Sequence, residues 1–265
     1  MTYRKPFRTA LAALLVLVPL LASGEARAQG GTFDHSAWSR LLAAHVDAHG
    51  GVDYDAFARS REFAGYLASL RRADPARLEP GERMALWINA YNAGAIALIN
   101  RHGERRSIRN VRRTLGILPG KGPWQEPVVV VAGRAYSLDG IVNGVLRTQF
   151  REPRIHFALV FAARGAPPLR REAYTGARLE AQLNDQGRIF LTRSPEKNRV
   201  DVGRRRVHLT RILDWYGYDV YGGAPESVGM WIAEFYPDGP ERQLLRSGRF
   251  TIAFTPFDWS LNSKR

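Results

Sequence analysis

A long stretch of apolar residues at helical spacing dominates the first half of the chain. Residues 82–102 carry this pattern, and Gly103 follows it. The centre of the stretch, residues 84–95, is apolar on nearly every face, which is typical of a helix buried on all sides. Asn89 and Asn92 interrupt this centre three positions apart, so a helix would place both amides on one face. The pattern therefore predicts a buried central helix that carries two polar groups.

Shorter patterns predict further helices and several strands. Apolar residues recur at helical spacing in six other segments, and the predicted helices are residues 36–49, 53–70, 138–150, 176–184, 213–216 and 227–236. Two apolar runs around Gly133 predict a β-hairpin formed by residues 128–131 and 135–138. A continuous apolar run predicts a buried strand at residues 155–163. Further short strands are predicted at residues 189–192, 200–202, 207–209 and 250–254.

The order of these elements indicates the fold class. Helices come first and most strands come in the second half, whereas a chain of βαβ units would alternate them. We therefore expect an α+β fold, with N-terminal helices followed by a mainly antiparallel sheet with interspersed helices. No internal repeat or linker interrupts residues 29–265, which we expect to form a single domain.

The first 28 residues have the pattern of a secretory signal peptide. Basic residues stand near the start, an apolar run covers residues 9–21, and Ala26-Arg27-Ala28 offers a cleavage site between small residues. The alternative is a membrane anchor, but a helix needs roughly 20 apolar residues to span a bilayer. No later segment reaches that length, so we expect no transmembrane segment. The predicted product is a periplasmic or secreted protein, cleaved near Ala28.

Composition narrows the chemistry and the partners. The chain has no cysteine, which excludes disulfides, thiolate nucleophiles and iron–sulfur clusters. The net charge is +14 at pH 7, of which residues 1–28 contribute +3. A basic surface attracts anionic polymers, and since an exported protein rarely meets nucleic acid, we expect an anionic envelope polymer or a partner protein instead. The alternative is a merely soluble basic surface, whose many arginines reflect GC-rich coding.

The buried helix offers the first candidate site. Buried amides that lack hydrogen bonds cost about 1–3 kcal/mol each, so Asn89 and Asn92 must have partners. They either clamp a neighbouring loop or strand end, or they line a polar pocket and orient a ligand. In the second case Trp87 and Tyr91 of the same helix would be ligand contacts as well.

A histidine at the start of the predicted buried strand offers the second candidate. His156 lies near Arg154, which is a further candidate ligand contact. Asp258 stands between two aromatic residues near the C-terminus and could orient the histidine. His156 would then be a general base, although a lone histidine at such a position is more often a satisfied core or edge residue than a catalyst. Motifs for phosphate, dinucleotide and zinc binding are missing from the sequence, so we expect no metal site and no cofactor.

Several of these segments together resemble the family known as domain of unknown function 547 (DUF547), in its bacterial exported branch. The resemblance is carried by residues 38–54, by Trp87-Ile88-Asn89-Ala90-Tyr91-Asn92-Ala93, and by Tyr136-Ser137-Leu138-Asp139. It continues through residues 153–159, 167–169 and 257–262. It therefore covers nearly all of residues 29–265.

The departures from the family pattern concern its polar residues. After the histidine, the resemblance implies a cysteine, a serine and a second cysteine, where this chain has Phe161, Ala163 and Ala166. It also implies a glutamate–histidine pair where the chain has Val142-Asn143. Neither phenylalanine nor alanine can act as a nucleophile or accept a proton.

Two hypotheses follow from this comparison. The first is a non-catalytic binding or scaffolding protein of the cell envelope, which keeps the scaffold and has lost the reactive groups. The second is a hydrolase or transferase that works without cysteine, with His156 as general base, Asp258 as its orienting partner and the two asparagines binding an oxyanionic group.

Overall fold

The computed structural model describes residues 31–111, 122–221 and 225–264. The predicted signal peptide, residues 1–28, lies outside these ranges. Helices make up the first half and two small sheets follow, so the α+β class is confirmed. Within the described part of the chain, no helix is both long and apolar enough to cross a membrane.

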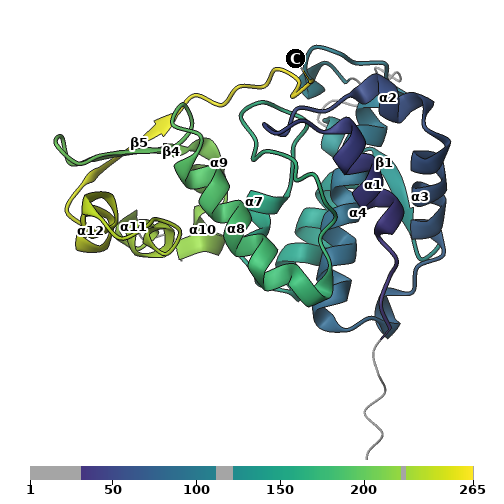
Figure 1. The fold of residues 1–265 in the computed structure, drawn as a ribbon, viewed down its shortest axis with the longest axis horizontal. Helices are drawn as coiled ribbons and strands as arrows, with labels where there is room; N and C mark the ends of the chain where they lie inside the picture. The colour runs from purple at the N-terminus through teal and green to yellow at the C-terminus, as the bar shows by residue number, and fades with distance from the viewer. Residues whose placement is uncertain (1–30, 112–121, 222–224, 265) are drawn as a thin grey trace, which may run out of the picture.

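The predicted central helix is α4 (Pro80–Arg101), and its middle is buried on every side. Three helices pack in front of it on the right of Figure 1: α1 (Ser36–His45), α2 (Tyr54–Arg59) and α3 (Arg61–Arg71). Trp38 of α1 stacks on Tyr66 of α3, with ring centroids 5.3 Å apart. The single helix predicted over residues 53–70 is two helices, because the Ser60 hydroxyl caps α3 by accepting a hydrogen bond from the Phe63 amide at 3.1 Å.

The predicted hairpin is confirmed as β1 (Pro127–Val131) and β2 (Arg134–Ser137), which pair antiparallel. Ala132 and Gly133 at its turn both have positive φ, the requirement of a tight turn that matches strand twist. The helix predicted over residues 138–150 begins at Leu138 but contains a π-helical stretch. It consists of α5 (Leu138–Ile141), the π-helix η4 (Val142–Leu146) and α6 (Arg147–Gln149). Such π-helical turns are frequent at functional sites.

Two predicted strands are wrong. Residues 155–163 form the short helix α7 (Ile155–Ala158) and then an irregular buried segment. Residues 189–192 are the last turn of α8 (Leu179–Thr192). The first run is buried on all sides and the second is buried at Phe190 and Leu191, and apolar periodicity cannot distinguish a short buried strand from a buried helix or loop.

The second sheet lies at the far end of the molecule, with α8 between it and the first half (Figure 1). It contains β3 (Arg199–Asp201), β4 (Arg206–Thr210) and β5 (Thr251–Thr255). The hairpin of β3 and β4 is antiparallel as expected, but β5 joins β4 in parallel. This parallel pairing requires a crossover, which consists of α9 (Arg211–Trp215), α10 (Gly217–Tyr221), α11 (Pro225–Ala233) and α12 (Pro240–Ser247).

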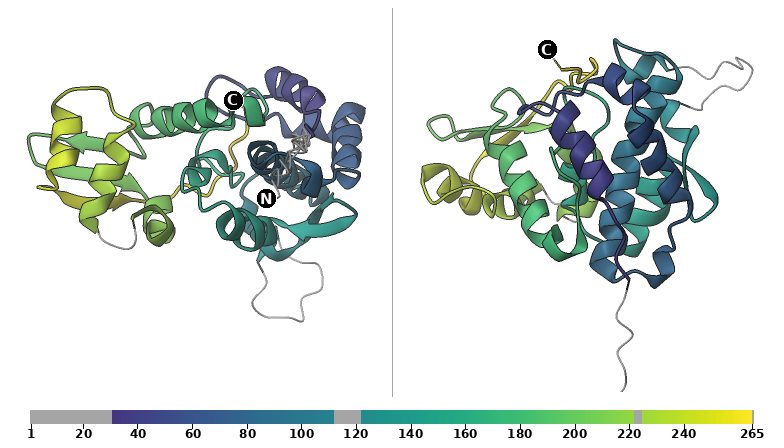
Figure 2. Two further views of the ribbon diagram at one scale, coloured as in Figure 1. Left: turned by 90° about the horizontal axis from the view of Figure 1, so that it is seen from below. Right: turned by 45° about the vertical axis from the view of Figure 1, so that its right-hand side comes forward.

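The C-terminal tail ties the two ends of the molecule together. After β5 it returns to the first half, where the chain ends near α2 (Figures 1 and 2). The Leu261 amide donates to the Arg106 carbonyl at 2.7 Å, and the Val52 amide donates to the Asn262 carbonyl at 2.8 Å. The tail therefore brings aromatic residues near position 259 back to the centre.

Short one-turn helices complete the chain: η1 (Pro75–Arg77), η2 (Ile108–Asn110), η3 (Pro123–Gln125) and η5 (Gly176–Arg178).

Candidate functional site

The two asparagines of α4 hold backbone segments in place. The Asn89 side chain donates to the Tyr174 carbonyl at 2.7 Å and accepts from the Tyr174 amide at 3.0 Å. Asn92 donates to the Ala158 carbonyl and accepts from the Val160 amide, each at 3.0 Å. Both ends of both amides are thus used by backbone. Of the two alternatives, the structure places these residues as clamps, and neither lines any of the three cavities described below.

Trp87 and Arg154 are likewise engaged within the protein. Trp87 is buried and packs edge-on against Tyr136, with ring centroids 4.9 Å apart. Arg154 forms ion pairs with Glu152 at 2.6 Å and Glu180 at 2.9 Å, and these carboxylates raise the pKa of its guanidinium. Neither side chain lines one of the three cavities.

The carboxylate beside His156 belongs to Asp219, and the expected pairing with Asp258 is wrong. Nε2 of His156 lies 3.0 Å from Oδ2 of Asp219, which stands on α10. Asp258 instead accepts hydrogen bonds from the amide and the hydroxyl of Ser260, at 2.9 and 2.6 Å. Asp258 and His156 line different cavities. His156 and Asp219 lie far apart in the sequence, so no motif or spacing could have indicated that they pair.

His156 is held as a neutral imidazole. Its side chain is fully buried, its ring stacks on Tyr216 at 4.0 Å, and burial lowers its pKa to about 4. Asp219 also forms a two-contact ion pair with Arg147, which holds the pKa of that carboxyl below its usual range. Because the carboxylate accepts the proton of Nε2, the basic nitrogen of His156 is Nδ1, which is buried and has no partner. His156, Asp219 and Arg147 line a cavity of about 320 Å³.

A second cavity, of about 220 Å³, is walled mainly by aromatic rings, and we call it the aromatic pocket. Its lining residues come from α4, η3, α5, the π-helix, the segment after α7, the end of α9 and the C-terminal tail. They are Tyr91, Trp124, Gln125, Leu138, Asp139, Val142, Phe161, Trp215, Tyr216 and Trp259. Residues from position 91 to position 259 therefore meet at one site.

The three tryptophans form a connected rim. Trp215 stacks on Trp259 with centroids 5.6 Å apart, and Trp124 meets Trp259 edge-on at 5.8 Å. Trp215 is 44% exposed, which is unusual for so large an apolar side chain. An exposed aromatic beside a cavity is a common feature of binding sites. Sequence reasoning missed these three residues, although Trp215-Tyr216 and Trp259 stand out as aromatic positions near the chain end.

Polar groups stand at the inner side of the aromatic pocket. Tyr91 of α4 is 1% exposed, and its hydroxyl has no hydrogen-bond partner among the described residues. Burial raises the pKa of Tyr91 and that of Tyr216, so both phenols keep their protons at neutral pH. Asp139 uses one oxygen, Oδ1, to accept from the Asn143 amide at 2.8 Å. Of the predicted ligand contacts, Tyr91 lies at a cavity.

The departures from the DUF547 pattern map to this pocket and to a larger neighbour. Val142 and Phe161 line the aromatic pocket. Ala163 and Ala166 line a cavity of about 650 Å³. The two cavities are neighbours, because Phe257, which lines the larger one, packs on Trp259 of the aromatic pocket, with ring centroids 4.4 Å apart. Positions where the resemblance implies cysteine, serine and glutamate are therefore occupied by side chains that carry no reactive group.

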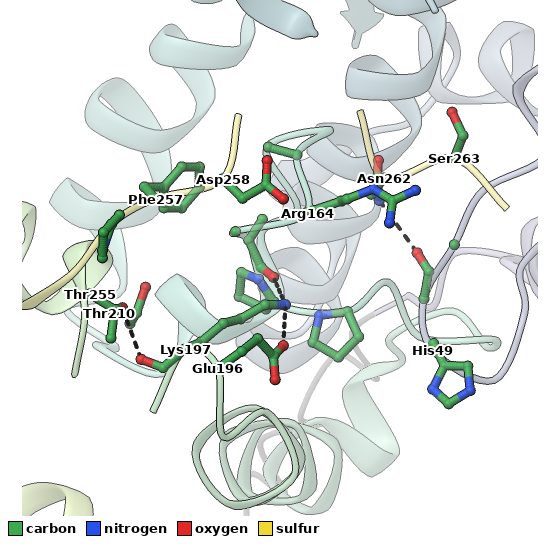
Figure 3. A pocket seen from close by; sticks show the side chains of 18 of the residues that line it. His49, Arg164, Glu196, Lys197, Thr210, Thr255, Phe257, Asp258, Asn262 and Ser263 are labelled. Carbon is green, nitrogen blue, oxygen red and sulfur yellow. Dashed lines mark hydrogen bonds and ion pairs between the residues drawn. The ribbon is translucent and has the colours of Figure 1, made fainter. Parts of the chain in front are cut away.

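The larger cavity contains charged residues of both signs (Figure 3). Lys197 and Glu196 extend into it from the segment after α8, and Arg164 and Asp258 lie across from them (Figure 3). The Lys197 amine donates to the Ala166 carbonyl at 3.0 Å, and burial lowers its pKa. Arg164 donates to the Leu261 carbonyl at 3.3 Å. These groups are therefore occupied with protein atoms. Among the described residues, no group of three or more acidic or histidine side chains gathers as a metal site would require.

Part of the chain matches a known protein family. Residues 75–191 match the family described as "Protein of unknown function, DUF547". A Bordetella petrii protein called LexA repressor is 30% identical over 118 residues, which is 43% of this chain and 52% of that protein. The chain thus spans about half the length of this curated relative. No solved structure matches the chain. The matched residues 75–191 include α4, Asp139, His156 and Phe161, so the match supports the DUF547 family for this central part of the chain.

Proposed function

We propose that the protein is an exported, non-catalytic binding protein of the bacterial cell envelope and that the aromatic pocket is its ligand site. One observation carries this proposal. Val142 and Phe161 stand in the pocket wall at positions where the family resemblance implies glutamate and cysteine. Neither side chain can attack a substrate or move a proton. The pocket nevertheless keeps an exposed tryptophan and an unpaired buried hydroxyl, which are groups that a ligand can contact.

Its export is supported by the signal-peptide pattern of residues 1–28. Its partner, in this proposal, is an anionic envelope polymer. The sheet at the far end of the molecule supports that choice, because Arg199 on β3 pairs with His208 on β4, and Arg206 lies two residues before His208 on β4. Both cations, together with desolvation as the larger cause, lower the pKa of His208. The exposed residues Arg204, Arg205 and Arg249 extend this basic surface.

The proposal is tested by binding and turnover measurements on the same sample. Purified residues 29–265 are titrated with alginate oligosaccharides, with polyglutamate of similar charge and with neutral dextran. We expect saturable binding of the anionic polymers, weakened by salt, and no cleavage of the polymer. Turnover of the polymer, or of peptide, amide or ester substrates, by the pure protein would refute the non-catalytic assignment. A failure to bind either anionic polymer would refute the proposed partner.

A second candidate function is a hydrolase or transferase that uses His156 as general base. It is favoured by a neutral imidazole that lines a cavity beside Asp219 and Arg147. The geometry is less favourable than that of the aromatic pocket, because Nε2 is engaged by Asp219 and the imidazole ring stacks on Tyr216. Any measured activity that His156→Gln leaves unchanged would eliminate this candidate. Activity that is lost in His156→Gln and in Asp219→Asn would support it instead.

A further inference from the structure

We infer that the aromatic pocket binds a single pyranose ring, by ring stacking on its tryptophans and by hydrogen bonds at its inner end. This inference rests on the proposed function and names the chemical class of its ligand. Two features of the pocket carry it: the aromatic rim formed by Trp124, Trp215 and Trp259, and the polar inner side formed by Tyr91, Asp139 and Tyr216.

The rim favours a ligand with a flat, weakly positive apolar face. The face of an aromatic ring carries partial negative charge. The C–H bonds on one face of a pyranose present the complementary partial positive charge. Trp215 is exposed and is held in place by its stacking on Trp259, so a ligand ring meets a surface that is already ordered.

The inner side selects among ligands that could stack on such a rim. The Tyr91 hydroxyl is buried without a partner, and a buried unsatisfied hydroxyl costs about 1–3 kcal/mol. A ligand that relieves this cost must accept or donate a hydrogen bond. The Asp139 carboxylate, whose charge acts on the Tyr91 phenol, can only accept. The complementary ligand therefore both donates and accepts hydrogen bonds, as the hydroxyl groups of a sugar do.

The Tyr91 hydroxyl distinguishes a sugar from a quaternary ammonium ion as the ligand. Aromatic cages with a nearby carboxylate also attract such cations. A tetraalkylammonium group can form no hydrogen bond, so it would leave the Tyr91 hydroxyl unsatisfied. The pocket volume of about 220 Å³ lies below the range of about 300–1,000 Å³ for drug-sized ligands, which suits one ring.

A cation at the rim connects this pocket with the anionic polymer of the proposed function. The Arg109 guanidinium lies 5.7 Å from the ring centroid of Trp259. Arg109 is exposed on η2, so its charge is accessible to a carboxylate on a stacked sugar. A polymer of acidic pyranoses could thus place one ring in the pocket and its charges near arginine.

The test is a titration monitored by tryptophan fluorescence, with residues 29–265 as the protein. The probes are glucose, galactose, mannose, N-acetylglucosamine and glucuronate, with the open-chain sorbitol and gluconate and with tetramethylammonium as controls. We expect at least one pyranose to change the emission saturably and the controls to have no effect. Trp215→Ala should abolish the response. Tyr218→Ala, at an exposed aromatic outside the pocket, should preserve it.

A pair of tyrosine variants tests the hydrogen bond itself. Tyr91→Phe should weaken pyranose binding about tenfold, the loss expected for one hydrogen bond. Tyr174→Phe is the matched control, because this tyrosine is also buried with an unpartnered hydroxyl but lines none of the three cavities. The inference is overturned if no pyranose binds, if sorbitol or tetramethylammonium binds equally well, or if the two variants behave alike. If alginate and polyglutamate still bind in that case, the inference fails while the proposed function stands. If no polymer binds either, both fail.

Discussion

His156 and Asp219 form a partly buried pair in which Nε2 of the imidazole lies 3.0 Å from Oδ2 of the carboxylate. The pair joins α7 to α10 and is extended by Arg147, which bonds the same carboxylate. The most reactive-looking histidine of the chain is therefore part of a packed polar network. This arrangement leaves the aromatic pocket as the better candidate for the functional site.

Removing the carboxylate should destabilise the protein. Asp219→Ala leaves the fully buried His156 and the partly buried Arg147 without their partner. We expect a loss of about 2–3 kcal/mol in the free energy of unfolding, since breaking a largely buried pair leaves uncompensated polar groups. Asp214→Ala, which removes an exposed ion pair with Arg211, should cost less than about 1 kcal/mol. If the two variants lose the same free energy of unfolding in urea denaturation, the network around Asp219 stabilises the protein no more than an exposed ion pair does.

Stability should rise with pH through the window in which His156 titrates. Burial lowers the pKa of His156 to about 4 in the folded protein, against 6.5 when it is exposed, although Asp219 opposes this shift. Between these values the unfolded chain binds the additional proton, so acidification favours unfolding. This loss of stability is absent above about pH 6.5 and complete near pH 4, where it lowers the free energy of unfolding by an amount on the order of 3 kcal/mol.

A matched variant isolates this contribution. His156→Gln should flatten the pH dependence of urea denaturation between pH 4.5 and pH 6.5, in part. His35, whose pKa burial also lowers to about 4, should account for a similar slope that His35→Gln removes. An unchanged slope in His156→Gln would mean that the imidazole is protonated in the folded protein.

The clamp formed by Asn92 should be important for stability. Asn92→Ala leaves the Ala158 carbonyl and the Val160 amide buried without partners. Each unsatisfied group costs about 1–3 kcal/mol, so a total loss of about 2–6 kcal/mol is expected in chemical denaturation. Asn184→Ala, at an exposed asparagine with one bond to Arg154, is the control and should cost less than about 0.5 kcal/mol. A loss as small as the control's would show that Asn92 is free to bind a ligand.

Tyr91→Phe should behave in the opposite way in the unliganded protein. The substitution removes a buried hydroxyl that has no partner, so the melting temperature should stay the same or rise. A clear decrease in melting temperature would indicate that the hydroxyl has a structural partner, and it would weaken the assignment of Tyr91 to ligand binding.

The parts of the fold that the sequence predicted well are those with a long apolar run or a clear turn. Helix α4 follows from the apolar stretch over residues 82–102, which is too long for a strand, and the hairpin of β1 and β2 follows from two short apolar runs around Gly133. The segment 155–163 could not be assigned because it is buried on every side, and its backbone is held by Asn92 rather than by a neighbouring strand. Periodicity contains no information in such a case.

The candidate site was less predictable for a different reason. The carboxylate that faces His156 comes from α10, which is part of the crossover from β4 to β5, so no local spacing connects the two residues. The aromatic pocket likewise needs Trp259, which reaches Trp215 only because the C-terminal tail returns to the first half. The departures at Val142 and Phe161 were visible from the family resemblance, but only the folded chain shows that both line one pocket.

The measurement that tests the central claim most directly is a titration of residues 29–265 with alginate oligosaccharides, with reducing ends assayed in the same samples. If the protein is a binding protein, the tryptophan emission changes saturably, Trp215→Ala weakens binding at least tenfold, and the number of reducing ends stays constant. If reducing ends accumulate with time, and if His156→Gln abolishes that increase, the protein is a hydrolase and the non-catalytic assignment is wrong.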